Sequence, residues 1–339
     1  MSPTANRAWI LRSRPQEQVS VDDFAYSEDI GLPPELEDNQ ILVRNRLFSC
    51  APTIRNWLNE PGKSYRGSIA LGDPIRGLTG AEVLQSRHPA YAAGDLVTAI
   101  SPWQDFAVLS PDGAPVPVTR MEEGMTLLDA MTLYSANSLT AFAGLVEVGR
   151  ARAGETVMVS GAAGSVGAMA CQIARNLGCR VIGIAGGGEK CTWLREICGV
   201  DAVDYKAGDL RGQIRALDAG KVNLFFDNVG GAALDVAVDY MAPFGRIVVS
   251  GQVSSYDRAD VARGPDMMKL VYGRLQISGF LVGDHASHYP EMWAQLRQWA
   301  ADGELQVRID RREGFDQLPS AFVDLFRGVN QGTLVVDAS

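Results

Sequence analysis

The sequence predicts an α/β protein in which a doubly wound parallel sheet is joined to a discontinuous, barrel-like β-rich domain. Three observations predict this fold. An uncharged strand pattern at residues 156–160 is followed by three glycines at three-residue spacing. Strand and helix patterns then alternate as far as residue 282, whereas short strand patterns occupy residues 8–100.

The glycine segment predicts a βαβ unit. The strand pattern Thr156–Ser160 leads into Gly161, Gly164 and Gly167, and apolar residues then recur at the helical period before a second strand pattern at 181–184. Without Cβ atoms, such a turn allows backbone N–H groups to approach a diphosphate at the helix N-terminus. We interpret it as a dinucleotide-binding turn, although a glycine triplet alone is equally explained by close packing.

Before this unit, short strand patterns separated by turn signals are typical of a barrel-like β domain. The expected strands cover residues 8–11, 40–45, 47–50, 80–84 and 94–100, and a helix covers 126–148.

After the unit, further strands alternate with helices, as in a parallel sheet covered on both faces. The expected strands are 201–205, 222–227, 245–251 and 275–282, and the expected helices are 209–217 and 232–241. The remaining elements are a helix that follows residue 291, a strand at 305–309, a helix at 317–326 and a strand at 333–336.

We expect this tail to rejoin the N-terminal domain. Residues 1–125 and 285–339 are therefore assigned to a catalytic, substrate-binding domain, and residues 126–284 to a nucleotide-binding domain. The nucleotide is expected in the cleft between the two domains.

Composition narrows the class of protein. The 339 residues suffice for two domains, and 46% hydrophobic with 21% charged residues is ordinary for a globular protein. We expect no membrane span and no signal peptide. A formal charge of -9 argues against a nucleic-acid or anionic-membrane surface. None of the five cysteines forms a CxxC pair, so we expect reduced thiols in a cytoplasmic protein.

Several segments resemble the zinc-independent medium-chain dehydrogenases/reductases, whose nucleotide-binding domain is a Rossmann fold. The segments that carry this resemblance are Leu139–Phe142, Gly154–Gly167, Asp227–Gly231 and Phe244–Ile247. Within the family the chain is most similar to the prostaglandin, 2-alkenal and curcumin reductases. The similarity to this branch lies in Asn59–Tyr65, Arg87–Pro89, Trp103–Phe106 and Ser254–Tyr256.

The resemblance implies NADPH-dependent reduction of the carbon–carbon double bond of α,β-unsaturated ketones or aldehydes. Hydride would go to the β-carbon of a small-molecule substrate, and the protein would be a homodimer through its nucleotide domain. An NADPH:quinone oxidoreductase and a non-catalytic NADPH-binding protein are the alternatives.

Three departures from the family pattern bear on the substrate more than on the reaction. The family's Asp-Pro-Tyr-Met-Arg is here Ala51–Arg55, and its Met-Pro-Gly is here Ala136–Ser138. The segment 66–77 also differs.

The second strand of the unit bears on the choice of cofactor. NAD-binding units usually end this strand with an acidic residue that accepts the ribose hydroxyls, but here it ends in Ala185 and three glycines. Glu189 is the rival candidate for such an acid. By resemblance, Lys190 and Tyr205 are ligands of the 2′-phosphate, although Lys190 could be a solvated surface lysine. We predict a preference for NADPH.

Other residues are cofactor-binding candidates by their place in the turn or by resemblance. They are Thr140, Gly164, Ser165, Val166, Gly167, Gly186, Asn228, Gly251, Phe280, Val282 and Asn330. A plain turn at Asn330 and simple strand packing at Phe280 and Val282 are alternative interpretations.

No metal is expected. Zinc-containing relatives have Gly-His-Glu where this chain has Gly80-Ala81-Glu82, and its only histidines are His88, His285 and His288. A catalytic zinc normally needs three protein ligands.

Without zinc, the carbonyl oxygen that gathers negative charge needs another hydrogen-bond donor. A tyrosine is suitable because it is neutral at pH 7 and can donate. Tyr256 follows a strand at the edge where open α/β sheets bind ligands, and it matches the tyrosine that the family implies. Tyr65 is the second catalytic candidate. Loop packing is the alternative for both.

Overall fold

The computed structural model describes residues 5–32, 35–63, 67–114, 116–257 and 264–339. The chain divides into two compact units. The first, here called the β-rich unit, comprises Met1–Met131, Ile309–Asn330 and Leu334–Ser339. The second, the α/β unit, comprises Thr132–Arg308 and Gln331–Thr333. The expected domain boundaries, between residues 125 and 126 and between residues 284 and 285, stay a prediction. The compact units divide a few residues later, after Met131, at the first boundary, and 24 residues later, after Arg308, at the second.

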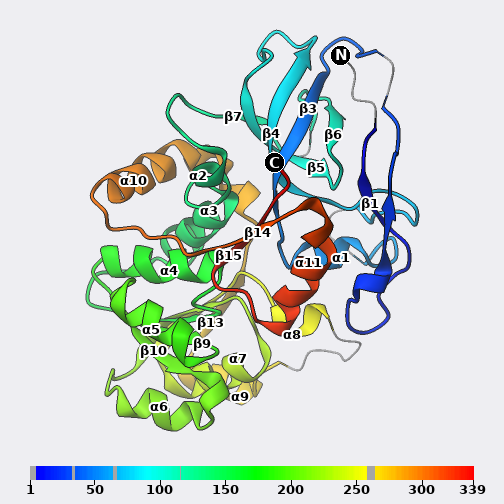
Figure 1. The fold of residues 1–339 in the computed structure, drawn as a ribbon. Coiled ribbons are helices and arrows are strands. Elements are labelled where there is room, and N and C mark those ends of the chain that lie inside the picture. Colours follow the sequence, from blue (N-terminus) through cyan, green and yellow to red (C-terminus); the bar gives the residue numbers. More distant parts are fainter. Residues whose placement is uncertain (1–4, 33–34, 64–66, 115, 258–263) are drawn as a thin grey trace. The chain divides into compact units, whose positions relative to one another are not determined.

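The sheet of the α/β unit has six parallel strands (Figure 1). Their order is β10 (Asp201–Asp204), β9 (Arg180–Ala185), β8 (Thr156–Ser160), β11 (Val222–Asp227), β12 (Met241–Val249) and β13 (Gln276–Gly279). The strand order reverses between β8 and β11, as in a doubly wound sheet. The predicted fold class is confirmed, and this switch point is where such sheets bind ligands.

Helices cover both faces of this sheet because its strand residues alternate between two cores. Val157 and Val159 pack in one core and Met158 in the other. The first core takes in residues of α3 (Ala136–Ala143), α4 (Ser165–Asn176), α5 (Gly188–Glu196) and α10 (Tyr289–Ala301). The second takes in residues of α6 (Leu210–Ala216), α7 (Gly231–Tyr240) and α9 (Met267–Gly273).

The β-rich unit contains an antiparallel sheet that draws on both ends of the chain. Its order is β14 (Ile309–Glu313), β15 (Thr333–Asp337), β3 (Ile41–Ser49), β4 (Arg76–Ser86), β5 (Leu96–Pro102) and β7 (Thr119–Arg120), with β6 (Phe106–Leu109) also paired to β3. The pairing of β15 with β3 confirms that the domain is discontinuous.

This antiparallel sheet, for which a barrel-like shape was expected, does not close into a barrel among the described strands. One edge of β3 is divided, since residues 41–44 pair with β6 and residues 47–49 pair with β15. Strands therefore attach side by side, and the pairing path among the described strands stays open from β14 to β7. A small hairpin of β1 (Ala8–Leu11) and β2 (Phe24–Ser27) completes the strands.

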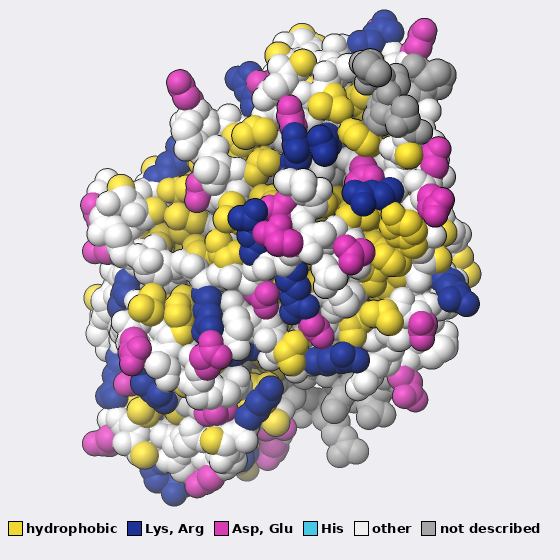
Figure 2. Space-filling view, viewed as in Figure 1, with side chains coloured by type: hydrophobic (Ala, Val, Ile, Leu, Met, Phe, Trp, Pro, Cys, Tyr) yellow, Lys and Arg dark blue, Asp and Glu magenta, His cyan; other side chains and the backbone are white. Residues whose placement is uncertain are grey.

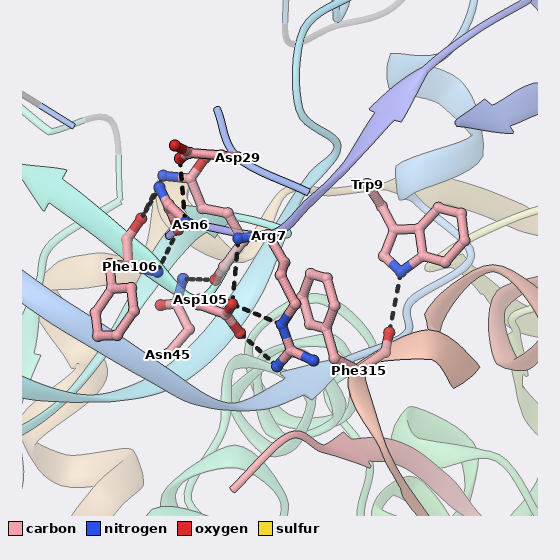
Figure 3. A network of polar contacts seen from close by, with 9 residues as sticks. Asn6, Arg7, Trp9, Asp29, Asn45, Asp105, Phe106 and Phe315 are labelled. Carbon is pink, nitrogen blue, oxygen red and sulfur yellow. Dashed lines mark hydrogen bonds and ion pairs between the residues drawn. The ribbon is translucent and has the colours of Figure 1, made fainter. Parts of the chain in front are cut away.

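Polar contacts attach the N-terminal segment to this unit (Figure 3). Arg7 makes two hydrogen bonds to the carboxylate of Asp105, 2.8 and 2.9 Å long, and its guanidinium lies over the ring of Phe315. The indole of Trp9 donates to the carbonyl of Phe315 at 3.0 Å. Asp105 belongs to the Trp103–Phe106 segment, so this part of the family signature has a structural role.

The remaining helices are short, apart from α11. They are the 3-10 turns Val21–Asp23, Tyr205–Ala207, Val282–His288 and Phe315–Gln317, the π-helix Gly144–Val148, and α1 (Ile54–Trp57), α2 (Leu127–Met131), α8 (Val253–Tyr256) and α11 (Leu318–Arg327).

The strand expected at 305–309 starts later, at Ile309. The backbone of Gln306 is instead bound on both sides by the side-chain amide of Gln172, at 2.7 and 2.9 Å. These bonds hold the segment against α4 rather than in a sheet.

On the face shown in Figure 2, basic and acidic side chains are interspersed among the described residues. Within the described ranges, we find no helix with the length and apolarity that crossing a membrane requires. All five cysteines are buried, and none of them forms a disulfide.

Candidate functional site

The turn after β8 needs its glycines. Gly161 has a φ of +59°, and its carbonyl accepts the N–H of Gly164 at 3.0 Å. A Cβ atom at Gly167 would lie 2.1 Å from the carbonyl oxygen of Gly161. Glycine at 167 therefore allows α4 to begin directly against the end of β8.

The N-terminus of α4 is suited to an anion. The first turn carries no acidic residue, and Gly164 at the N-cap has no side chain that could take up the free N–H groups. The hydroxyl of Ser165 is held to one side, 2.9 Å from the hydroxyl of Thr333 and 3.2 Å from the amide of Asn137. A helix N-terminus behind a bare glycine turn fits a dinucleotide diphosphate.

Asn137 and Ser138 replace family residues, and the structure gives each a local partner. Asn137 reaches Ser165 as described, and Ser138 donates to the carbonyl of Leu133 at 2.5 Å. The bond from Asn137 attaches α3 to the start of α4, whereas the bond from Ser138 holds the start of α3 to the residues that precede it.

A buried carboxylate joins β8 and β11 at the switch point. Asp227 is 1% exposed, and its Oδ1 accepts the hydroxyl of Ser160 at 2.6 Å and the N–H groups of Val229 and Gly230 at 3.1 and 2.9 Å. Burial raises the pKa of the Asp227 carboxyl, although these three hydrogen bonds act in the opposite direction.

The same contacts place Asn228 beside the glycine turn. Its backbone N–H donates to the Ser160 hydroxyl, and its side-chain amide donates to the Ser160 carbonyl at 2.8 Å. A Cβ at Gly161 would lie 3.6 Å from the Cβ of Asn228.

At the end of β9, Gly186 lies under the ring of Tyr205. A Cβ at Gly186 would lie 2.7 Å from each of two ring atoms, and Tyr205 is 53% exposed. The N–H of Gly187 donates to Asp204 at 2.8 Å, and this bond is the main cause of the lowered pKa of Asp204. Lys190 is half-buried in the first turn of α5.

Tyr256, the last residue of α8, lies against the loop that follows β12. The phenol oxygen accepts the N–H of Gln252 at 3.3 Å. A Cβ at Gly251 would lie 3.1 Å from that oxygen and 3.4 Å from the carbonyl oxygen of Asn228. The structure thus brings together three of the predicted residues: Asn228, Gly251 and Tyr256.

Other predicted residues have structural contacts of their own. Thr140 donates to the carbonyl of Ala136 within α3. Phe280 packs against Gly144, where a Cβ would lie 2.8 Å from the ring, and Val282 packs on the same core.

The remaining predicted residues are Val166, Asn330 and Tyr65. Val166 packs partly buried on the core beside β8. Asn330 belongs to the β-rich unit, and Tyr65 lies outside the described residues.

Sequence reasoning missed the polar partners of these residues. Asp204, Ser160 and Arg308 were not identified, and Asp227 was noted only as part of the family pattern. One available signal was an aspartate that closes the apolar run Val222–Asp227.

A search of the described residues for groups of three or more His, Cys, Asp or Glu that could hold a metal ion finds none. His88 faces Asp112 at 3.1 Å, and His288 faces Glu147 at 3.3 Å.

Comparison with known proteins agrees with this geometry. Residues 7–116 match the family model described as N-terminal domain of oxidoreductase, and residues 165–301 match the one described as zinc-binding dehydrogenase. The chain is 31% identical to the NADPH-dependent curcumin reductase of Escherichia coli (strain K12), over 98% of this chain and 96% of that protein. It belongs to the zinc-independent medium-chain dehydrogenases/reductases.

Two further similarities place the chain among these medium-chain reductases. It is 33% identical to the NADP(+)-dependent 2-alkenal reductase of Nicotiana tabacum, over 89% of this chain and 88% of that protein. The crystal structure of CurA from Vibrio vulnificus in complex with NADPH is 30% identical, with a TM-score of 0.91 over 98% of this chain and 99% of that one. The predicted family is confirmed.

Proposed function

We propose that this medium-chain reductase reduces the carbon–carbon double bond of α,β-unsaturated ketones or aldehydes with NADPH. The chain is an NADPH-dependent oxidoreductase by family, and the finer assignment concerns the acceptor. The observation that carries it is the phenol of Tyr256 at the C-terminal end of β12, beside Gly251 and Asn228. Ligands bind at this edge of open α/β sheets.

We assign the cofactor to the glycine turn after β8 and to the end of β9. The turn Gly161–Gly167 and the first N–H groups of α4 would hold the diphosphate. Lys190 and Tyr205 would hold the 2′-phosphate at the end of β9. When bound, NADPH supplies the hydride that is delivered to the β-carbon of the substrate.

Tyr256 would act on the carbonyl oxygen of the substrate. The phenol oxygen accepts the N–H of Gln252 and donates no hydrogen bond to another described residue, so its hydrogen is available to a substrate. A phenol that accepts one hydrogen bond donates another more strongly. Such a donor stabilises the negative charge that gathers on the carbonyl oxygen during hydride transfer.

The proposal is tested by following NADPH oxidation with unsaturated ketones, unsaturated aldehydes and small quinones, and by identifying the products. We expect turnover with the unsaturated carbonyls and a saturated ketone or aldehyde as product. An allylic alcohol as the product, or turnover with quinones alone, would contradict the proposal. NADPH binding without turnover on any acceptor would favour a non-catalytic protein.

Replacing Tyr256 by phenylalanine is expected to lower kcat for the enone by roughly 100-fold, because one hydrogen bond to the developing oxyanion is lost. The affinity for NADPH should change little. Tyr240→Phe is the matched control, since its phenol donates to the carbonyl of Arg211 instead. Steady-state kinetics with both variants measure the effect on kcat. Full turnover by Tyr256→Phe would rule out Tyr256 as the hydrogen-bond donor to the carbonyl oxygen of the substrate.

The α/β unit also presents an apolar edge, along which we propose that two copies of the chain join. All four residues of β13 are exposed, and β13 pairs only with β12 among the described strands. Ile277 is 44% exposed, and Val271 and Tyr272 on α9 are 61% and 71% exposed. An unpaired, apolar edge strand of this kind is a template for pairing with another chain.

Replacing Ile277 by lysine is expected to convert a dimer into a monomer, because a charge on an edge strand opposes pairing. Light scattering coupled to size exclusion measures the mass in solution. Ile197→Lys is the control, since Ile197 is similarly exposed, at 48%, at the end of α5. A monomeric unmodified chain would refute the proposed dimer.

A further inference from the structure

Glu189 has polar partners that bear on the choice of cofactor. It lies in the first turn of α5, directly before Lys190, and its carboxylate forms an ion pair with the guanidinium of Arg308. The side-chain amide of Gln331 donates to the same carboxylate at 3.3 Å. All four residues belong to the α/β unit.

The carboxylate of Glu189 lies where it can affect the choice between NADH and NADPH. An acid near the end of the second strand of a dinucleotide-binding unit accepts the ribose hydroxyls of NADH. The same negative charge repels the 2′-phosphate of NADPH. Gly186 and Tyr205, at the end of β9, mark the place where that end of the cofactor would lie, and Glu189 is three residues beyond Gly186.

The backbone of Arg308 is fixed beside α4 and α5. Its carbonyl accepts the N–H of Thr333 at 2.8 Å, and a Cβ at Gly332 would lie 2.1 Å from the same oxygen. Two residues earlier, Gln306 is held on both sides by Gln172. The side chain of Arg308 is 22% exposed, whereas that of Glu189 is 69% exposed. Arg308 is thus the fixed partner of the ion pair, and the exposed side chain of Glu189 is the one that is free to change rotamer.

We propose that Arg308 is a positioning residue for cofactor selectivity: it holds and neutralises Glu189, so that this acid neither binds the ribose of NADH nor repels the 2′-phosphate of NADPH. The inference rests on the proposed binding of NADPH at the end of β9. Arg308 acts through Glu189, and Lys190 remains the direct ligand. Because Glu189 is largely exposed, solvent and salt screen its charge, and the effect is several-fold rather than absolute.

The test compares Arg308→Met, Glu189→Gln and the double variant, with dissociation constants for NADPH and NADH measured by isothermal titration calorimetry on the full chain. We expect Arg308→Met to lower the preference for NADPH over NADH by roughly fivefold at low salt, and less at high salt. The double variant should regain the preference of Glu189→Gln, because the released acid is then gone. Arg308→Lys should keep the wild-type preference.

Four other results would contradict the inference or the proposed cofactor site. A double variant that remains as poor as Arg308→Met would make Arg308 a direct phosphate ligand and overturn the inference. An unchanged preference in Arg308→Met, with an unfolding temperature near that of the wild type, would overturn it as well. A wild-type protein that binds NADH more tightly than NADPH would refute the proposed cofactor site itself, and Lys190→Ala without effect would do the same.

Discussion

Replacing Gly167 by alanine is expected to lower the free energy of unfolding by about 3 kcal/mol and to weaken NADPH binding strongly. The new Cβ would lie 2.1 Å from the carbonyl oxygen of Gly161, which is backbone and cannot rotate away. Either α4 moves off the end of β8 or the glycine turn opens. Both movements displace the N–H groups that would hold the diphosphate. Urea unfolding and calorimetric titration with NADPH measure the two effects.

Gly188→Ala is the control for the unfolding measurement. Gly188 is the first residue of α5, it has no positive φ, and no heavy atom lies within 4 Å of the position of its Cβ. Alanine there should leave stability unchanged or raise it by about 0.5 kcal/mol, since the unfolded chain loses freedom. Equal stability of the two variants would show that the contact between α4 and β8 is looser than the structure indicates.

The nucleotide fold was predictable because its signals are local. The strand Thr156–Ser160, the glycine turn and the helix that follows lie within one short segment. The uncharged run of the strand and the helical period of apolar residues after the turn can each be read locally. The alternation of strands and helices then restricts the sheet to a doubly wound arrangement. The same reasoning could not exclude a closed barrel in the β-rich unit, because closure depends on which edges pair, and β3 gives one edge to two strands.

The polar partners of the site were not predictable for a related reason. Ser160 and Asp227 are 67 residues apart, and Glu189 and Arg308 are 119 residues apart. No period or spacing in the sequence connects such pairs, and only the order of strands brings them together. The resemblance to a family named Lys190, Tyr205 and Tyr256, but it could not give the partners that orient them.

The stability of the fold depends strongly on the contact between Asp227 and Ser160. Asp227→Ala is expected to lower the free energy of unfolding by about 4 kcal/mol. It would leave the Ser160 hydroxyl and the N–H groups of Val229 and Gly230 without their common acceptor in a buried place. Asp227→Asn is the matched control, because its amide oxygen can accept the same three hydrogen bonds, and we expect it to lose only about 1 kcal/mol.

The dependence on pH separates the charge of Asp227 from its hydrogen bonds. Burial raises the pKa of this carboxyl above its ordinary value of 3.8, so between the two values the folded protein binds more protons than the unfolded chain. The stability contributed by protonated Asp227 is therefore complete below about pH 3.8 and is lost as the pH rises through the folded-state pKa.

Asp227→Asn lacks this titration. Relative to the wild type it should become more stable as the pH rises from 4 towards 7. Urea unfolding of both proteins across this range gives the difference, in which the titration of all other carboxyl groups cancels. A difference that is independent of pH would mean that the three hydrogen bonds outweigh burial and that the carboxylate at the switch point is held ionised.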